Sequence, residues 1–204
     1  MIWTALVWGC RSATEATSAP VPSAASPAEA ASSPACHDEL PAAASGEGSL
    51  YDLDLALETT VGAATVDLHR GHPVLIAMFY ASCQQACPMT IAKIQGIEAR
   101  LSPADRARLR VLLVSLDPDR DTIAALRELS TRHQLDDRWT VARTADPQVR
   151  ELAAALGVRY RKLADGTIAH STVIAMLDGE GIPRARVEGL GASDDALVAA
   201  IQGR

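Results

Sequence analysis

Runs of apolar residues divide the chain from about residue 74 onward into short strands and amphipathic helices. The longest run, residues 74–80, is continuous over seven positions, which is typical of a central strand covered on both faces. Further apolar strands are predicted at 111–116, 139–142 and 172–177. Apolar residues at helical spacing predict helices over 88–101, 122–132, 147–156 and 194–202. The regular alternation of the two types indicates an α/β fold.

Alternating apolar and polar residues predict a hairpin at each end of this region. Leu53, Leu55 and Leu57 alternate with polar positions, and a short returning strand follows over 64–68. A Gly-rich turn at 178–181 leads into a strand at 182–188. The order predicts a central, mainly parallel sheet with helices on both faces and an N-terminal β-hairpin extension. A closing antiparallel hairpin followed by a helix is the ending of a thioredoxin-like fold.

Residues 11–48 have a composition that cannot build a core. Ala, Pro and Ser make up 24 of these 38 residues, and none is aromatic. We expect a flexible tether here and one folded domain over 49–204. Five of the 25 acids and one of the 19 bases precede residue 49. The domain therefore carries 20 acids and 18 bases, and this near-neutral balance argues against nucleic acid as the main partner.

The first ten residues contain a segment similar to a bacterial lipoprotein cleavage box, Val7-Trp8-Gly9-Cys10. A lipid on Cys10 would attach the tether to a membrane, whereas the alternative is a short apolar leader with an incidental cysteine. An ordinary membrane-spanning helix is not expected, because no run of 18 apolar residues occurs. We expect a domain anchored in the bacterial cell envelope that faces the periplasm or the cell exterior.

Two cysteines follow the longest apolar strand. Cys83 and Cys87 have three residues between them, and Pro88 suits the first position of a helix. Both thiols are therefore expected at a helix N-terminus, where the helix dipole and free amides favour the thiolate. A soft-metal site, a catalytic disulfide and a buried structural pair all remain open. Three intervening residues, rather than the two of thioredoxin-type oxidoreductases, favour metal.

Three motifs resemble the Sco/SenC family of copper proteins. They are the segment 79–88 around the two cysteines, the loop Asp117-Pro118-Asp119-Arg120-Asp121-Thr122, and His170-Ser171-Thr172. The resemblance extends from about residue 49 to 201. It implies a thioredoxin-like domain that binds copper through Cys83, Cys87 and His170. It also implies a role in assembling the binuclear copper centre of cytochrome c oxidase subunit II. Many members carry Asp immediately before this histidine, where this chain has Ala169.

The remaining histidines, the loop 117–122 and Cys36-His37 are not expected to be main-site ligands. His69, His72 and His133 are expected to be solvated surface residues. The loop 117–122 is expected mainly to cap the helix that follows it, with Asp121 or Thr122 as the cap. Cys36-His37 in the tether is either an incidental dipeptide or an accessory soft-metal site.

Two functions follow from this combination. The first is a copper metallochaperone rather than an enzyme, which receives copper from other chaperones and passes it to subunit II or another acceptor. The second is a thiol–disulfide oxidoreductase in which Cys83 and Cys87 reduce the cysteines of the acceptor's copper site. A simple dithiol has no need of His170, which favours the first. A peroxidase is disfavoured, because Tyr80 occupies the position three residues before Cys83 where a Thr is usual.

Overall fold

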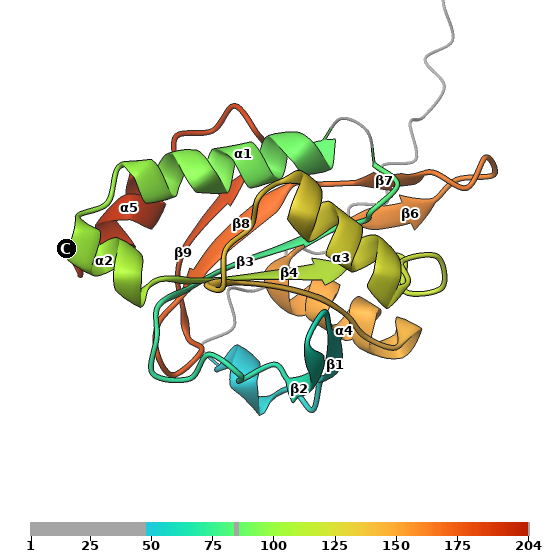
Figure 1. Cartoon of the computed structure of the whole chain (residues 1–204), viewed down its shortest axis with the longest axis horizontal. Helices are drawn as coiled ribbons and strands as arrows, with labels where there is room; N and C mark the ends of the chain where they lie inside the picture. The colour runs from blue at the N-terminus through green and yellow to red at the C-terminus, as the bar shows by residue number, and fades with distance from the viewer. Residues whose placement is uncertain (1–47, 84–85, 204) are drawn as a thin grey trace, which may run out of the picture. The chain divides into compact units, whose positions relative to one another are not determined.

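The computed structural model describes residues 48–83 and 86–203, and a seven-stranded sheet forms their centre (Figure 1). The strand order is β2-β1-β5-β4-β3-β8-β9. Its strands are β1 (Ala56–Thr59), β2 (Gly62–Thr65), β3 (Val74–Phe79), β4 (Arg110–Ser115), β5 (Trp139–Arg143), β8 (Val173–Leu177) and β9 (Pro183–Glu188). Strands β6 (Tyr160–Lys162) and β7 (Ile168–His170) form a separate two-stranded sheet.

The sheet is parallel at its centre and antiparallel on both flanks. Strand β4 pairs in parallel with β3 and with β5, as predicted, whereas β1 and β8 run antiparallel to their neighbours. The direction of β8 has a physical cause. The chain reaches β8 from the β6–β7 hairpin, which lies at the carboxyl end of β3, so β8 must run back along the sheet. Both flanking hairpins, β1–β2 and β8–β9, are confirmed.

Helices cover both faces of the sheet, as predicted. In Figure 1, α1 and α3 lie on one face and α4 on the other. The parallel crossovers β3–α1–β4 and β4–α3–β5 run in the same direction along the sheet, so right-handed connections place α1 and α3 on the same face. The helices are α1 (Ala86–Ala99), α2 (Pro103–Arg108), α3 (Ile123–Arg132), α4 (Asp146–Leu156) and α5 (Asp195–Ile201). Thr122 caps α3 by accepting from the Ala125 N–H, and Gly157 ends α4 in the left-handed conformation with φ of 67°.

Three short elements were not predicted. They are the 3-10 turn Leu50–Asp52, helix α2 and the β6–β7 hairpin. None has a long apolar run or a sustained period, so each depends on contacts with the rest of the domain. The hairpin is the important omission, because it ends at His170.

The core fixes the strand and the helix that flank the cysteine loop. All six residues of β3 are buried, and Ile91, Ile94 and Ile97 place one face of α1 against the sheet with exposures of 1% or less. Each such side chain contributes about 1.5–3 kcal/mol by leaving water. The segment between β3 and α1 is therefore held at both ends by the best-packed part of the domain.

Three expectations concern residues outside the described part of the chain, namely lipidation of Cys10, the flexible tether over 11–48, which is described only at its last residue, and a metal-binding role for Cys36-His37. Within residues 48–83 and 86–203, no helix combines the length and apolar character needed to cross a membrane.

Candidate metal centre

The two cysteines lie around one turn at the carboxyl end of β3. Cys83 donates its N–H to the Tyr80 carbonyl at 3.1 Å and is partly exposed. Cys87 lies in the first turn of α1 and is 2% exposed. The Cys87 N–H points at the Cys83 Sγ at 3.4 Å, and the Tyr80 N–H points at the Cys87 Sγ at 3.5 Å. Each sulfur therefore accepts one backbone N–H, and neither is in a disulfide.

Two details of this turn differ from expectation. Helix α1 begins at Ala86, so Pro88 is its third residue rather than its first. The missing N–H still costs nothing there, because the first four amides of a helix have no intrahelical acceptor.

The second difference concerns the charge of the Cys87 thiol. Burial raises the pKa of the Cys87 thiol far above its ordinary value, with smaller contributions from Cys83 and Asp121. The helix terminus does not offset this desolvation, so Cys87 is a thiol at neutral pH, contrary to the prediction.

Tyr80 connects the cysteine turn to His170. Besides its N–H contact with Cys87, its side chain hydrogen-bonds to Cys83; burial and this bond raise the pKa of the phenol. Its ring meets the His170 ring edge to face, with centroids 5.8 Å apart and an interplanar angle of 77°. The three residues proposed as ligands from the sequence thus contact a single tyrosine.

His170 presents an unsatisfied nitrogen. Its Nδ1 lies 3.0 Å from the Ser171 carbonyl. Burial lowers the pKa of the imidazole, although the bond to Ser171 opposes this effect. The ring is therefore neutral at pH 7, with Nδ1–H donating to Ser171 and a lone pair on Nε2. Among the residues that the structure describes, that Nε2 is buried and has no hydrogen-bond partner. Buried polar atoms rarely remain unpaired, and a neutral imidazole with a free lone pair is a common metal ligand.

The three side chains are near one another without forming a closed cage. Among the described residues, no group of three or more His, Cys, Asp or Glu side chains is close enough to hold a metal ion. The cysteines instead open onto a hollow of about 480 Å³. It is lined by Ala81, Ser82, Cys83, Cys87, Pro88, Leu129, Arg132 and His133. His170 reaches the pair from the Tyr80 side, so joint coordination requires a small movement of the imidazole or of a thiol.

The remaining histidines of the domain divide into two groups. His69 and His72 flank the start of β3, at the opposite end from the cysteines, and their rings contact the Thr140 hydroxyl and the Arg108 carbonyl, each at 3.0 Å. His69 is half-buried rather than solvated; burial, with Arg110 and His72, lowers its pKa to about 4. His133 is also part-buried and lines the cysteine hollow, which the sequence did not indicate.

The loop 117–122 does more than cap α3. Thr122 is the cap, whereas Asp121 turns inward and is 2% exposed. The Asp121 carboxylate accepts the Ala81 N–H at 2.9 Å and the Ser115 hydroxyl, and burial raises its pKa. Ala81 begins the cysteine turn, so Asp121 helps to position it. The available signal was topological: the loop leaves the carboxyl end of β4, which neighbours β3.

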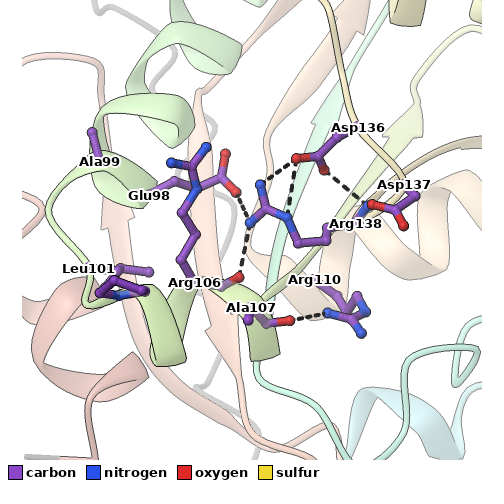
Figure 2. Close-up of a pocket in the computed structure, with 10 residues that line it drawn as sticks. Glu98, Ala99, Leu101, Arg106, Ala107, Arg110, Asp136, Asp137 and Arg138 are labelled. Carbon is purple, nitrogen blue, oxygen red and sulfur yellow. Dashed lines mark hydrogen bonds and ion pairs between the residues drawn. The ribbon is translucent and has the colours of Figure 1, made fainter.

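A larger hollow, of about 610 Å³, lies elsewhere, between the end of α1, helix α2 and the segment before β5 (Figure 2). Figure 2 shows Arg138 between Glu98 and Asp136, with ion pairs of 2.5 Å to each. Glu98 is 3% exposed, and its carboxylate is compensated by this arginine. Three of the lining charges, Glu98, Asp136 and Arg138, thus pair with one another, and neither cysteine lines this hollow.

Comparison with known proteins gives a consistent picture. The SCO1/SenC family model matches residues 47–203. Bradyrhizobium japonicum ScoI, solved with copper bound, is 21% identical with a TM-score of 0.61, over 73% of this chain and 96% of that chain. Yeast Sco1, also solved with copper bound, is 20% identical with a TM-score of 0.61, over 74% and 85%. No curated protein sequence matches the chain.

A third structure, BsSco, is described as a member of the Sco family of cytochrome c oxidase assembly proteins with a disulfide switch. It is 16% identical with a TM-score of 0.64, over 76% of this chain and 92% of that chain. At such identities the structures show a shared thioredoxin-like fold. The family model spans well over half of the chain, including both cysteines and His170. The chain therefore belongs to the SCO1/SenC family.

Proposed function

We propose that this protein binds copper and delivers it during the assembly of cytochrome c oxidase. The ligands are the Cys83 and Cys87 sulfurs and the His170 Nε2. One observation carries the proposal. The His170 ring contacts Tyr80, and its buried Nε2 has no hydrogen-bond partner among the described residues. A purely structural histidine would be expected to satisfy both ring nitrogens.

The donor set suits copper in both common oxidation states. Two thiolates satisfy soft Cu(I), whereas Cu(II) is harder and gains more from the imidazole nitrogen. Metal binding displaces the thiol protons, because the thiolate is the ligand. The structures of the Bradyrhizobium and yeast proteins with copper bound support this assignment.

Delivery requires that a partner reach the metal. Cys83 is partly exposed on an open hollow, so an acceptor's ligands can approach the copper from that side and replace Cys83 first. We assign subunit II of cytochrome c oxidase, with its binuclear copper centre, as the acceptor, and other copper chaperones as the source. The description of BsSco as an oxidase assembly protein supports this choice.

The proposal includes attachment to the bacterial envelope. A lipid on Cys10 and a tether over 11–48 would hold the domain near a membrane-bound acceptor, facing the periplasm or the cell exterior. Mass spectrometry of protein from a bacterial membrane fraction should identify a diacylglyceryl-modified Cys10 as the first residue. A soluble protein with a different mature N-terminus would contradict the anchor.

Replacing His170 tests the copper site. We expect His170→Ala to weaken Cu(II) by more than about 100-fold, since even outer partners of a ligand contribute roughly 10–100-fold. Cu(I) should be much less affected, because the thiolates remain. His72→Ala is the matched control, as this half-buried histidine lies at the other end of β3. Anaerobic titrations with both copper states measure the outcome.

A thiol–disulfide reductase is the second candidate, favoured by the unequal exposure of the cysteines. The accessible Cys83 would attack an acceptor disulfide, and buried Cys87 would then resolve the mixed disulfide. The pair loses two electrons and two protons and ends as a disulfide, while the acceptor gains two thiols. Cys87→Ser should then trap the mixed disulfide, detectable on a non-reducing gel. If His170→Ala binds Cu(II) like the parent but loses reductase activity, this function replaces the first.

A further inference from the structure

The β6–β7 hairpin carries His170 but lies outside the main sheet. Its two strands have three residues each and pair only with one another. Ile168, which is 4% exposed, is its buried apolar anchor. Figure 1 shows the hairpin projecting beyond the end of the sheet. The hairpin therefore depends on contacts outside the main sheet for its position, while the His170 ring itself contacts the Ser171 carbonyl and the Tyr80 ring.

Charged contacts connect the hairpin to the loop 117–122. The Lys162 Nζ lies 3.5 Å from Asp117 Oδ1, 3.5 Å from Asp119 Oδ2 and 3.9 Å from Asp146 Oδ1. Arg120 donates to the Asp117 carboxylate and to the Gly166 carbonyl in the hairpin turn. Two cations thus connect the hairpin to buried Asp117, which is 2% exposed.

The same loop also holds the cysteine turn. Asp121 accepts the Ala81 N–H, two residues before Cys83. Asp117 and Asp121 are joined through Ser115, whose hydroxyl donates to the Asp121 carboxylate and accepts the Asp117 N–H at 2.9 Å. The loop thereby contacts both segments that contribute ligands.

We propose that the loop 117–122 is a two-sided clamp that sets the distance between the cysteine pair and His170. Asp121 positions the cysteine turn, and Asp117, through Lys162 and Arg120, positions the hairpin. Lys162 and Arg120 are positioning residues, since neither contributes a ligand. The inference about copper rests on the proposed function, whereas the inference about the hairpin does not.

The two sides of the clamp differ in strength. Asp121 is buried, so its hydrogen bonds are shielded from water and salt. The Lys162 side chain is 42% exposed, so its ion pairs are modest and are screened by salt. The hairpin that carries His170 is consequently held less firmly than the cysteine turn. This suits a site where His170 must move to reach a metal held by the thiols.

The test compares Lys162→Gln with Arg161→Gln. Arg161 is exposed on the same strand and forms no ion pair among the described residues, so it controls for loss of one positive charge. In the metal-free protein, Lys162→Gln should speed hydrogen exchange of the amides in 160–170 by roughly two- to tenfold, the range expected for a partly exposed ion-pair cluster. Arg161→Gln should leave these rates unchanged.

Copper titration provides the second measurement. Lys162→Gln should weaken Cu(II) by roughly two- to tenfold, and should change Cu(I) by less than about twofold. High salt should reduce Cu(II) affinity in the parent and have a smaller effect in the variant.

The outcomes separate the two proposals. Equal exchange rates in Lys162→Gln and the parent, or equal acceleration in both variants, would overturn the clamp. Equal loss of Cu(I) and Cu(II) would also overturn it, because the hairpin would then not act through His170. If the hairpin loosens only in Lys162→Gln while the parent binds no copper, the clamp stands and the copper function fails.

Discussion

The two regions that contribute the candidate ligands are built in different ways. Strand β3, which leads to the cysteines, is buried along its whole length and pairs with β4 on one side and β8 on the other. The β6–β7 hairpin, which leads to His170, has short strands, one well-buried side chain and several ion pairs to a loop. Packing therefore positions the thiols, and partly exposed charges help to hold the hairpin that carries the imidazole. A metal carrier can use this difference, because one ligand can move while the others stay in place.

The difference between β3 and the β6–β7 hairpin also explains why the sequence predicted the first and not the second. The apolar run ending at Tyr80 predicted β3, and its junction with the next helix placed Cys83 and Cys87 together. The segment 157–171 has no comparable run, and its only buried residues are Val158 and Ile168. The hairpin was missed because long-range contacts stabilise it. His170 was identified through its resemblance to a family motif, and no periodicity around it could have done so.

The loop 117–122 shows a second limit of local reasoning. An acidic loop before a helix favours capping, and Thr122 does cap α3. The hydrogen bond from the Ala81 N–H to Asp121 spans 40 positions in sequence, so only the packing of β3 beside β4 brings the two together. The thiolate prediction was wrong for Cys87 for a related reason: the burial that raises the pKa of this thiol is a property of the whole fold.

Removing a thiol should have the largest effect, because it breaks the rigid side of the site. Cys83→Ser and Cys87→Ser should each weaken Cu(I) by more than about 100-fold, since a hydroxyl is a poor ligand for a soft ion. Both should also abolish formation of the intramolecular disulfide. Cu(I) competition with a chromophoric chelator measures the affinity, and His72→Ala again serves as control. Retention of parental Cu(I) affinity in either variant would exclude that sulfur as a ligand.

Removing the Asp121 carboxylate should loosen the cysteine turn. Asp121→Ala leaves the Ala81 N–H and the Ser115 hydroxyl without their acceptor, so the free energy of unfolding should fall by about 1–3 kcal/mol. Thr122→Ala is the matched control and should cost about 1 kcal/mol through loss of the cap. Urea unfolding gives both values.

Hydrogen exchange distinguishes the roles of these neighbouring residues. Amides 80–83 should exchange faster in Asp121→Ala and normally in Thr122→Ala. If both variants leave these amides protected, the loop is only a helix cap and does not position the cysteines.

The pH dependence of Cu(I) binding should report the burial of Cys87. Burial raises the pKa of this thiol well above neutrality, so Cys87 is protonated at pH 7 and loses its proton when copper binds. Affinity should therefore rise with pH between about pH 6 and 8, by roughly tenfold per unit for each proton released. His170 should add little to this slope above pH 7, because burial lowers the pKa of its ring below the ordinary value. Calorimetry in buffers of different ionisation enthalpy counts the protons, and a flat profile would show that Cys87 is already ionised.

The smallest effect is expected in the tether. In the proposed site, Cys83, Cys87 and His170 provide a full donor set for one copper ion, so Cys36→Ala should leave one copper per chain and unchanged Cu(I) affinity. Cys36-His37 has the same donor types as the main site, but the Ala-, Pro- and Ser-rich composition around it predicts a segment without a core to fix these side chains. Without such a framework, the chain must pay the entropy of ordering itself when it binds a metal, which weakens binding. Metal analysis of the two proteins after purification under reducing conditions decides the question. If the copper content of Cys36→Ala is half that of the parent, the tether holds a second ion, and a rigid framework is not required for copper binding in this chain.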